Sequence, residues 1–210
     1  MEIILIRHAQ SIGNEKDIVQ GHTDEGLSEL GIEQAKQLAS YFKQSNLNAI
    51  YSSDLSRAIQ TAKSTAEKLN LEIKIDPNLR EADFGHSEGM TYKEVQEKFP
   101  EEYNRWNNNF FNRPGWFESF ESHFIRVKSA LEKILKNQDL NYRVAVFTHG
   151  GSIKTQLAYF NKLSGEEIAK LRTLNCSLTT IKFNPTKNYN DGKLICYNEE
   201  VIKNSTKRDF

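Results

Sequence analysis

Short apolar runs alternate along this chain with longer segments in which apolar residues recur at helical spacing. Three of these runs, Ile3–Ile6, Ala49–Ser52 and Val144–Phe147, end in polar or turn-forming residues. Runs of this length and composition are typical of parallel strands that are buried on both faces. The pattern therefore predicts a strand at each of the three places.

Helical patterns follow the first two of these strands. Segment 28–42 begins at Ser28 and carries its apolar side chains on one face, and segment 54–69 begins at Asp54 in the same way. Serine and aspartate are residue types that cap helix N-termini, so we expect each to open a helix. Because strand and helix alternate, the sequence predicts an α/β fold, a three-layer sandwich whose mainly parallel central sheet is flanked by helices.

The stretch from about 84 to 122 breaks this alternation. It has no strand period and mixes polar residues with the aromatic residues Tyr92, Phe99, Tyr103, Trp106, Phe110, Phe111, Trp116 and Phe117. We interpret it as a small helical insertion over the sheet, whose rings form the insertion's own core or, as the less favoured alternative, a platform for a ligand. A helix over Ser119–Leu135 and late strands at Ser177–Ile181 and Leu194–Tyr197 are expected to complete one domain, 1–210.

The bulk properties exclude several classes of protein. The chain has 210 residues and a formal net charge of +0, so we expect neither nucleic acid nor membrane as a partner. No apolar stretch approaches the roughly 20 residues that cross a bilayer. Cys176 and Cys196 lie far apart, outside any zinc or disulfide pattern, which favours a cytoplasmic protein. The Lys/Asn-rich end after Ile202 is expected to be a frayed, solvated tail.

Basic and imidazole side chains follow the predicted strands, at the edge of an α/β sheet where ligands bind. The first strand ends in Arg7 and His8, and the second leads to Arg57 one helical turn later. A third strand, expected as the fifth or later in the chain, ends in His149 and Gly150. Arginine forks match phosphate oxygens, and the N–H groups of a helix opening at Gly150 favour an anion. These residues predict a phosphate site.

The same residues could carry out phosphoryl transfer. A neutral His8 can attack phosphorus and form a phosphohistidine, since neighbouring arginines lower the pKa of its imidazole. His149 can donate a hydrogen bond to the equatorial oxygens. Glu81 is the candidate proton donor, and Ser11 and Asn14 can contact phosphate or substrate. This chemistry needs no metal ion and no cofactor.

Each candidate also has a plainer interpretation when it is taken alone. Arg57 would be a surface residue of a helix, and Glu81 would be a solvated carboxylate in a turn. For the other three histidines, His22, His86 and His123, a place at the rim of the site or on the surface is the preferred interpretation.

Five blocks of sequence contain the candidate residues. They are R-H-A-Q-S-I-G-N from Arg7, the block from Gly21 to Ala35, S-D-L-S-R-A-I-Q-T-A from Ser53, L-R-E-A-D-F-G-H-S-E-G from Leu79 and T-H-G-G from Thr148. In composition and order these blocks resemble the histidine phosphatase superfamily, in its phosphoglycerate mutase-like branch. The resemblance covers most of the chain, and five blocks in the same order are a specific match.

The resemblance implies the roles argued above. His8 would be the nucleophile, Glu81 the proton donor, and Arg7, Arg57 and His149 the phosphate pocket. The residues expected to contact substrate are Arg7, Ser11, Asn14, Gln20, Gly21, Arg57, His149 and Gly150. The chain departs from the family pattern at Ala9, where glycine is usual, and at His22 and Gly26, where tryptophan and proline are frequent. We therefore expect less backbone freedom after His8 and a different pocket rim.

The predicted function is that of a metal-independent phosphatase that hydrolyses a small phosphomonoester through a phosphohistidine. Mutases of this branch usually carry a longer, proline-rich insertion, whereas Pro100 and Pro114 are isolated here. Phosphoglycerate mutase-type transfer and non-catalytic binding of a phosphorylated ligand remain the alternatives. The sequence leaves the natural substrate and the oligomeric state open.

Overall fold

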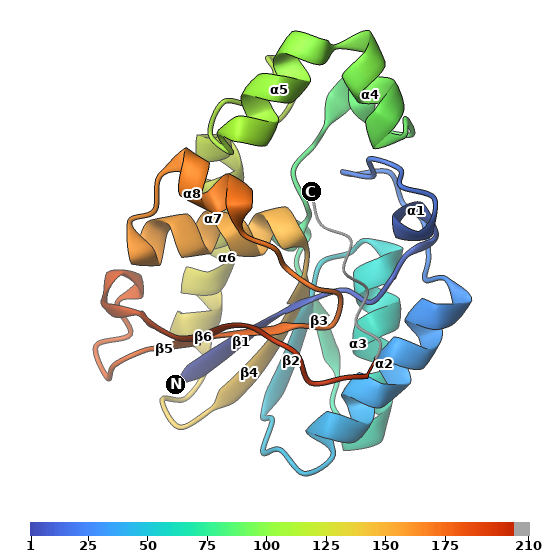
Figure 1. Cartoon of the computed structure of the whole chain (residues 1–210). Helices are drawn as coiled ribbons and strands as arrows, with labels where there is room; N and C mark the ends of the chain where they lie inside the picture. Colours follow the sequence, from blue (N-terminus) through green and yellow to red (C-terminus); the bar gives the residue numbers. More distant parts are fainter. Residues whose placement is uncertain (204–210) are drawn as a thin grey trace.

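The computed structural model of the chain describes residues 1–203 (Figure 1). Its strands are β1 (Glu2–Arg7), β2 (Ala49–Ser52), β3 (Ile73–Ile75), β4 (Arg143–Thr148), β5 (Leu178–Lys182) and β6 (Lys193–Glu199). Its α-helices are α1 (Ile12–Glu15), α2 (Glu29–Phe42), α3 (Ser56–Leu69), α4 (Tyr92–Lys98), α5 (Pro100–Asn108), α6 (Phe120–Asn137), α7 (Gly150–Asn161) and α8 (Gly165–Lys170). Its 3₁₀ turns are η1 (Pro77–Leu79), η2 (Gly85–Ser87) and η3 (Tyr189–Asp191). Apart from Lys203, the expected tail after Ile202 lies outside the described residues.

The six strands form one sheet in the order β3-β2-β4-β1-β5-β6. Strands β1 to β4 pair in parallel, whereas β5 runs antiparallel to β1 and β6 antiparallel to β5. The predicted fold class is therefore confirmed. Strand β3 was not predicted because Ile73–Ile75 is three residues long and only half-buried to exposed. The strand that ends before His149 is the fourth in the chain, not the fifth or later, since no strand lies between β3 and β4.

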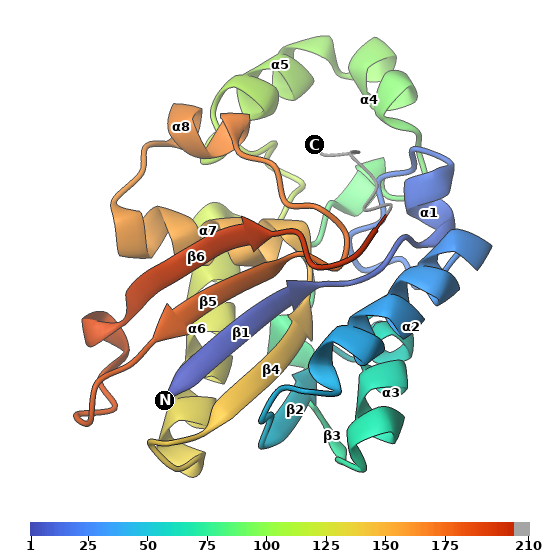
Figure 2. The same cartoon turned by 60° about the horizontal axis from the view of Figure 1, so that its bottom comes forward.

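Alternation within β1 explains the three layers. Ile3 and Leu5 pack in one apolar cluster with side chains of α6 and α7, and Ile4 and Ile6 pack in a second cluster with α2 and α3. All four side chains are buried, and each such burial contributes about 1.5–3 kcal/mol. Figure 2 shows α2 and α3 on one side of the sheet and α6 and α7 on the other.

One of the two predicted helix caps is correct. The Ser28 side chain accepts a hydrogen bond from the N–H of Gly31 at the start of α2. Asp54 does not cap α3, whose N-cap residue is Leu55. The Asp54 carboxylate instead accepts two hydrogen bonds from Arg80, at 2.7 and 2.5 Å. A bidentate arginine–carboxylate pair is stronger than a single cap bond, which explains why the cap is lost.

Helices α4 and α5 lie above the end of the sheet at which β1 and β4 finish (Figure 1). Trp106 of α5 packs on aromatic rings from the segments that flank the two helices: the Phe117 ring lies 4.9 Å from that of Phe84 and 5.2 Å from that of Trp106. The Asn109 side chain also donates a hydrogen bond to Glu166 of α8, at 2.7 Å. These contacts attach the C-terminal end of α5 to the rest of the molecule.

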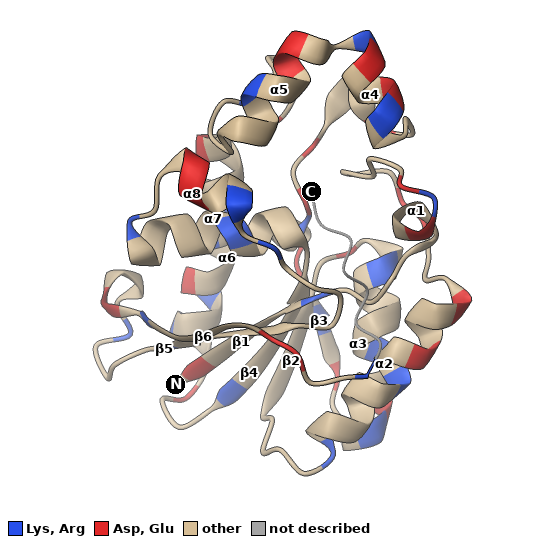
Figure 3. Cartoon of the chain, in the orientation of Figure 1, with Lys and Arg blue, Asp and Glu red and all other residues tan. Residues whose placement is uncertain are grey.

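Charged residues of both signs are interspersed along α2, α4 and α5 (Figure 3). Within residues 1–203, the helices are too short or too polar to cross a membrane.

Candidate active site

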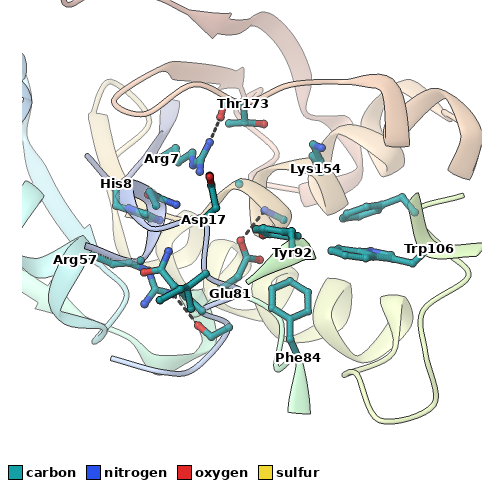
Figure 4. A pocket seen from close by; sticks show the side chains of 18 residues that line it. Arg7, His8, Asp17, Arg57, Glu81, Phe84, Tyr92, Trp106, Lys154 and Thr173 are labelled. Atoms are coloured by element: carbon teal, nitrogen blue, oxygen red, sulfur yellow. Dashed lines mark hydrogen bonds between the residues drawn. The ribbon is translucent and has the colours of Figure 1, made fainter. Parts of the chain in front are cut away.

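A cavity opens where β1 ends, and side chains of α4 and α5, among them Tyr92 and Trp106, line it (Figure 4). Arg7, His8 and Arg57 lie on one side of it, and Lys154 and Trp106 lie on the other. The cavity thus lies between the carboxyl edge of the parallel strands, where an α/β sheet binds its ligands, and the aromatic residues of α4 and α5.

His8 is held in one orientation by hydrogen bonds. Its backbone N–H donates to the Thr148 carbonyl at 3.0 Å, and its carbonyl accepts from the Asn175 amide at 2.8 Å. Its ring Nδ1 lies 2.7 Å from the Ala9 carbonyl oxygen. Because a carbonyl only accepts, Nδ1 carries the ring proton, and the lone pair lies on Nε2.

Burial keeps His8 neutral. Its pKa is lowered well below the ordinary 6.5, first by loss of solvent and then by the positive charges of Arg57 and Arg7. A neutral ring with its proton on Nδ1 offers Nε2 as a nucleophile at neutral pH.

Arg57 is buried in the first turn of α3, with 1% of its surface exposed. Its Nη1 donates to the Thr23 carbonyl at 2.9 Å and its Nη2 donates to the Gly21 carbonyl at 2.7 Å. Burial lowers its pKa to about 10, so the guanidinium remains charged at neutral pH. Arg7, at the end of β1, donates from Nη1 to the Thr173 carbonyl. Both cations are therefore fixed in place by backbone carbonyls.

His149 lies behind His8, with their ring centroids 5.2 Å apart. It is the N-cap residue of α7 and is fully buried, whereas its neighbour His8 lines the cavity. Its Nε2 lies 2.9 Å from the Ser53 hydroxyl, and its Nδ1 has no partner among the described residues. Burial, followed by the charge of Arg57, lowers its pKa well below 6.5.

Glu81 reaches the opening of α7. Its Oε1 accepts from the Ala82 N–H at 2.9 Å and its Oε2 accepts from the Gly151 N–H at 2.8 Å. A Cβ atom at Gly151 would lie 2.3 Å from Glu81 Oε1, so glycine is required for this approach. Glu81 lines the cavity opposite Arg57 and thus faces the same space as His8 (Figure 4).

Of the other residues expected to contact substrate, Asn14, Gln20, Gly21 and Gly150 line the cavity. Ser11 does not, because it is fully buried and its hydroxyl donates to Gln20 Oε1 at 2.8 Å. The structure therefore places Ser11 behind Gln20 as its support.

Ala9 follows His8 without strain. It is fully buried in the cluster beneath α2, its φ is negative, and its N–H donates to the Thr61 hydroxyl at 3.0 Å. The glycine usual in the family is therefore not required here.

The expectation for His123 was wrong. It is fully buried in α6, whereas His86 is exposed as expected and His22 is half-buried beside the Glu81 carbonyl. Among the residues at the site that were not predicted are Asp17, Lys154, Thr173 and Asn175. Lys154 could have been found, since it lies four residues after Gly150 and thus on the same helix face.

Asn175 was missed for a topological reason. It precedes β5, and an antiparallel strand begins at the edge of the sheet where the parallel strands end. The sequence pattern alone did not show the direction of β5.

Comparisons with known proteins agree with this geometry. The sequence pattern of the histidine phosphatase superfamily (branch 1) matches residues 3–192. The chain is 36% identical over 178 residues to phosphoserine phosphatase 1 of Hydrogenobacter thermophilus, covering 84% of this chain and 82% of that protein. It is 32% identical over 180 residues to a 2,3-bisphosphoglycerate-dependent phosphoglycerate mutase of Parvibaculum lavamentivorans, covering 80% of this chain and 84% of that protein.

The fold is also similar to that of a solved phosphatase. It superimposes on mycobacterial glucosyl-3-phosphoglycerate phosphatase complexed with VO3 with a TM-score of 0.85, at 25% identity and over 95% of this chain and 99% of that chain. Because the match of pattern extends over nearly the whole chain and the sheet, His8 and both arginines lie as described, this protein belongs to the histidine phosphatase superfamily (branch 1).

Proposed function

We propose that this protein is a phosphatase that hydrolyses a small phosphomonoester through a phosphohistidine on His8. The observation that carries the proposal is the state of His8: a neutral imidazole, its Nδ1 proton on the Ala9 carbonyl, beside two fixed guanidinium groups at a cavity. That arrangement suits attack on a phosphate dianion by Nε2.

In the first step His8 Nε2 forms a bond to phosphorus while the bond from phosphorus to the ester oxygen breaks. Arg7 and Arg57 neutralise the charge on the equatorial oxygens. With the Ser53 hydroxyl donating to its Nε2, His149 keeps its proton on Nδ1, which has no partner among the described residues, and Nδ1–H donates a hydrogen bond to one of these oxygens. Glu81 gives its proton to the leaving oxygen.

In the second step a water molecule attacks phosphorus and the bond to His8 Nε2 breaks. Glu81, now ionised, accepts a proton from this water and is ready for the next cycle. Two guanidinium groups supply the positive charge, so the balance of the reaction requires no metal ion.

The wall of the cavity opposite His8 would contact the rest of the substrate. It is formed by aromatic side chains, among them Tyr92 and Trp106, and by Lys154, of which 3% is exposed (Figure 4). Aromatic faces suit a small organic group, and an ammonium group there favours a substrate with a second acidic group.

The proposal is tested with p-nitrophenyl phosphate in an excess of chelator. We expect hydrolysis by the natural protein and a rate no greater than that of buffer for His8→Ala, because no nucleophile remains. Rapid acid-free quenching of labelled substrate should trap a base-stable phosphoenzyme that His8→Ala lacks. His86→Ala is the matched control, since His86 is exposed and should retain activity. Undiminished turnover by His8→Ala would remove the proposal.

Mutase activity is the second candidate, because a phosphoglycerate mutase is among the similar proteins. The same core performs hydrolysis or transfer according to whether water or a second substrate accepts the phosphoryl group. Isomerisation of 3-phosphoglycerate with a bisphosphorylated cofactor, faster than phosphate release, would favour the mutase. Tight binding of phosphate without turnover of any substrate would favour a binding protein.

A further inference from the structure

A second buried histidine lies beside the proposed proton donor. His123 of α6 is fully buried, and its Nε2 lies 3.9 Å from Glu81 Oε1 and 2.9 Å from the Ser152 hydroxyl. The steps proposed above do not use this imidazole. Burial of a polar ring costs free energy unless its hydrogen bonds are satisfied, so its partners are informative.

The hydrogen bonds around His123 run in one direction. Arg113 can only donate, and its Nη2 lies 3.3 Å from His123 Nδ1, so Nδ1 accepts and the ring proton is on Nε2. The Ser152 hydroxyl donates to the Arg80 carbonyl at 2.8 Å and therefore accepts from His123 Nε2–H. The chain of donors ends at the residue that precedes Glu81.

The charge state of both donors is fixed. Burial, followed by the charges of Arg113 and Arg126, lowers the pKa of His123 well below 6.5, so its ring is neutral. Burial lowers the pKa of Arg113 to about 10, so its guanidinium remains charged at neutral pH. Because the guanidinium charge would repel the positive end of an N–H group, His123 Nδ1 carries no proton where it faces Arg113. The ring proton is therefore on Nε2, on the side of Ser152 and Glu81.

The same face of α6 holds the backbone of the Glu81 segment. Arg126, one turn after His123, donates to the carbonyls of Asn78, Arg80 and Glu81 at 2.9, 2.7 and 2.6 Å. The segment is thus attached to α6 at three carbonyls, and Ser152 donates a second hydrogen bond to one of them, the Arg80 carbonyl.

We propose that His123 is a positioning residue for Glu81. Its Nε2–H fixes the Ser152 hydroxyl that donates to the Arg80 carbonyl, and its ring, 3.9 Å from Glu81 Oε1, limits the positions that the carboxyl can take. This inference rests on the proposed function of Glu81 as proton donor. Arg113, from the loop between α5 and α6, sets the tautomer of His123 and so connects the cover of the cavity to the acid.

A pair of substrates separates proton donation from every other step. p-Nitrophenolate leaves phosphorus without help from an acid, whereas the alkoxide of p-nitrobenzyl phosphate must be protonated as it leaves. The two esters are similar in size and aromatic character. A misplaced acid therefore lowers kcat/KM for the benzyl ester selectively, because a shift of about 1 Å in a catalytic group can cost on the order of a hundredfold.

His123→Leu is expected to lower kcat/KM for p-nitrobenzyl phosphate by about ten- to a hundredfold and that for p-nitrophenyl phosphate by less than about threefold. His123→Gln should restore most of the loss, because its amide N–H reaches the position of Nε2. Ser152→Ala removes the hydroxyl that accepts from His123 and should show the same selective loss. It serves as the test if His123→Leu does not fold. His86→Leu, an exposed histidine, is the matched control.

Equal losses on the two esters, unchanged activity on the benzyl ester, or no rescue by glutamine would overturn the positioning role. Glu81→Gln separates this failure from that of the proposed function. If Glu81→Gln is selective and His123→Leu is not, only the role of His123 is wrong. If Glu81→Gln itself shows no preference between the leaving groups, the acid assignment is wrong and the inference falls with it.

Discussion

Two adjacent glycines at the start of α7 differ in what they face. A Cβ atom at Gly151 would lie 2.3 Å from Glu81 Oε1, whereas one at Gly150 would lie 3.6 Å from Arg7 Nε, an ordinary contact. Gly151→Ala should therefore displace the Glu81 carboxyl and lower kcat for an alkyl phosphate by about ten- to a hundredfold. The measurement is steady-state hydrolysis with released phosphate as the readout.

Gly150→Ala is the matched control, because it adds the same methyl group one residue earlier and keeps the backbone N–H. It should lose much less activity than Gly151→Ala. Both variants should melt at similar temperatures, since both positions are helical. Equal losses in the two variants would show that close approach of Glu81 to this glycine does not matter.

After burial, the charge of Arg57 is the largest cause of the lowered pKa of His8. Arg57→Gln removes that charge, so the pKa of His8 should rise toward its ordinary 6.5. A base with a higher pKa is protonated at higher pH, so the acid limb of kcat/KM should move toward neutral pH. The limb is measured with an aryl phosphate from pH 4.5 to 8, and the ionisation of the substrate is common to all variants.

Lys63→Gln, on the exposed face of the same helix, serves as the comparison for the change in charge. Its profile should coincide with that of the natural protein. An acid limb that stays in place in Arg57→Gln, or that moves equally in Lys63→Gln, would contradict the assignment of the limb to His8.

Most of the residues that the sequence predicts for the candidate site line the cavity, for a physical reason. Arg7 and His8 follow a buried strand, and such residues must lie at the edge where ligands bind. His123 was misplaced although its signal was present. It lies four residues before Val127, and the buried residues Leu131 and Ile134 continue the same helical face. His123 thus lies on the apolar face of α6, but the prediction considered it alone, as a polar residue, and not as part of that face.

At the element scale, the apolar runs predicted five of the six strands, because burial on both faces leaves a clear composition. The exception, β3, lies at the edge of the sheet and exposes part of its short length to solvent. The lost cap at Asp54 has a different cause. Its partner Arg80 is 26 residues away, and no local pattern reports a contact at that separation.

Helix α7 contributes residues to two parts of the cavity. Gly150 and Gly151 lie at its phosphate end, and Lys154 lies one turn later in the opposite wall. Lys154→Met should raise KM for 3-phosphoglycerate about tenfold or more relative to glycerol 3-phosphate, because a charge-assisted hydrogen bond to the carboxylate contributes about 1.5–3 kcal/mol. The two esters differ in that carboxylate, and kcat/KM for each gives the comparison.

Lys162→Met, at the far end of α7, is the matched control for loss of a lysine. It should leave the preference between the two esters unchanged. If Lys154→Met lowers kcat/KM equally for both esters, the Lys154 ammonium does not bind the carboxylate of the substrate. The site would then select its substrates through the aromatic wall alone.

At the scale of the whole molecule, three buried neutral histidines couple folding to pH. The pKa values of His8, His123 and His149 are all lowered well below 6.5, in each case mainly by burial. In the unfolded chain these rings bind protons as the pH falls through 6.5, whereas in the folded protein they remain neutral. The unfolded state then binds more protons, so stability must fall with pH in that window.

Carboxylates act at lower pH and do not obscure the effect. Arg80 lowers the pKa of Asp54 below its ordinary 3.8, so this pair stabilises the fold above that pH and loses its contribution only below it.

Between pH 6.5 and 5 the free energy of unfolding should therefore fall by up to about 1.4 kcal/mol per pH unit for each histidine, or about 4 kcal/mol per unit for three. Urea unfolding at fixed temperature and several pH values measures this slope. His123→Gln removes one of the three groups and should reduce the slope by about a third. A free energy of unfolding that is constant from pH 7 to 5 would mean that these imidazoles are not held neutral, and the nucleophilic state proposed for His8 would lose its physical basis.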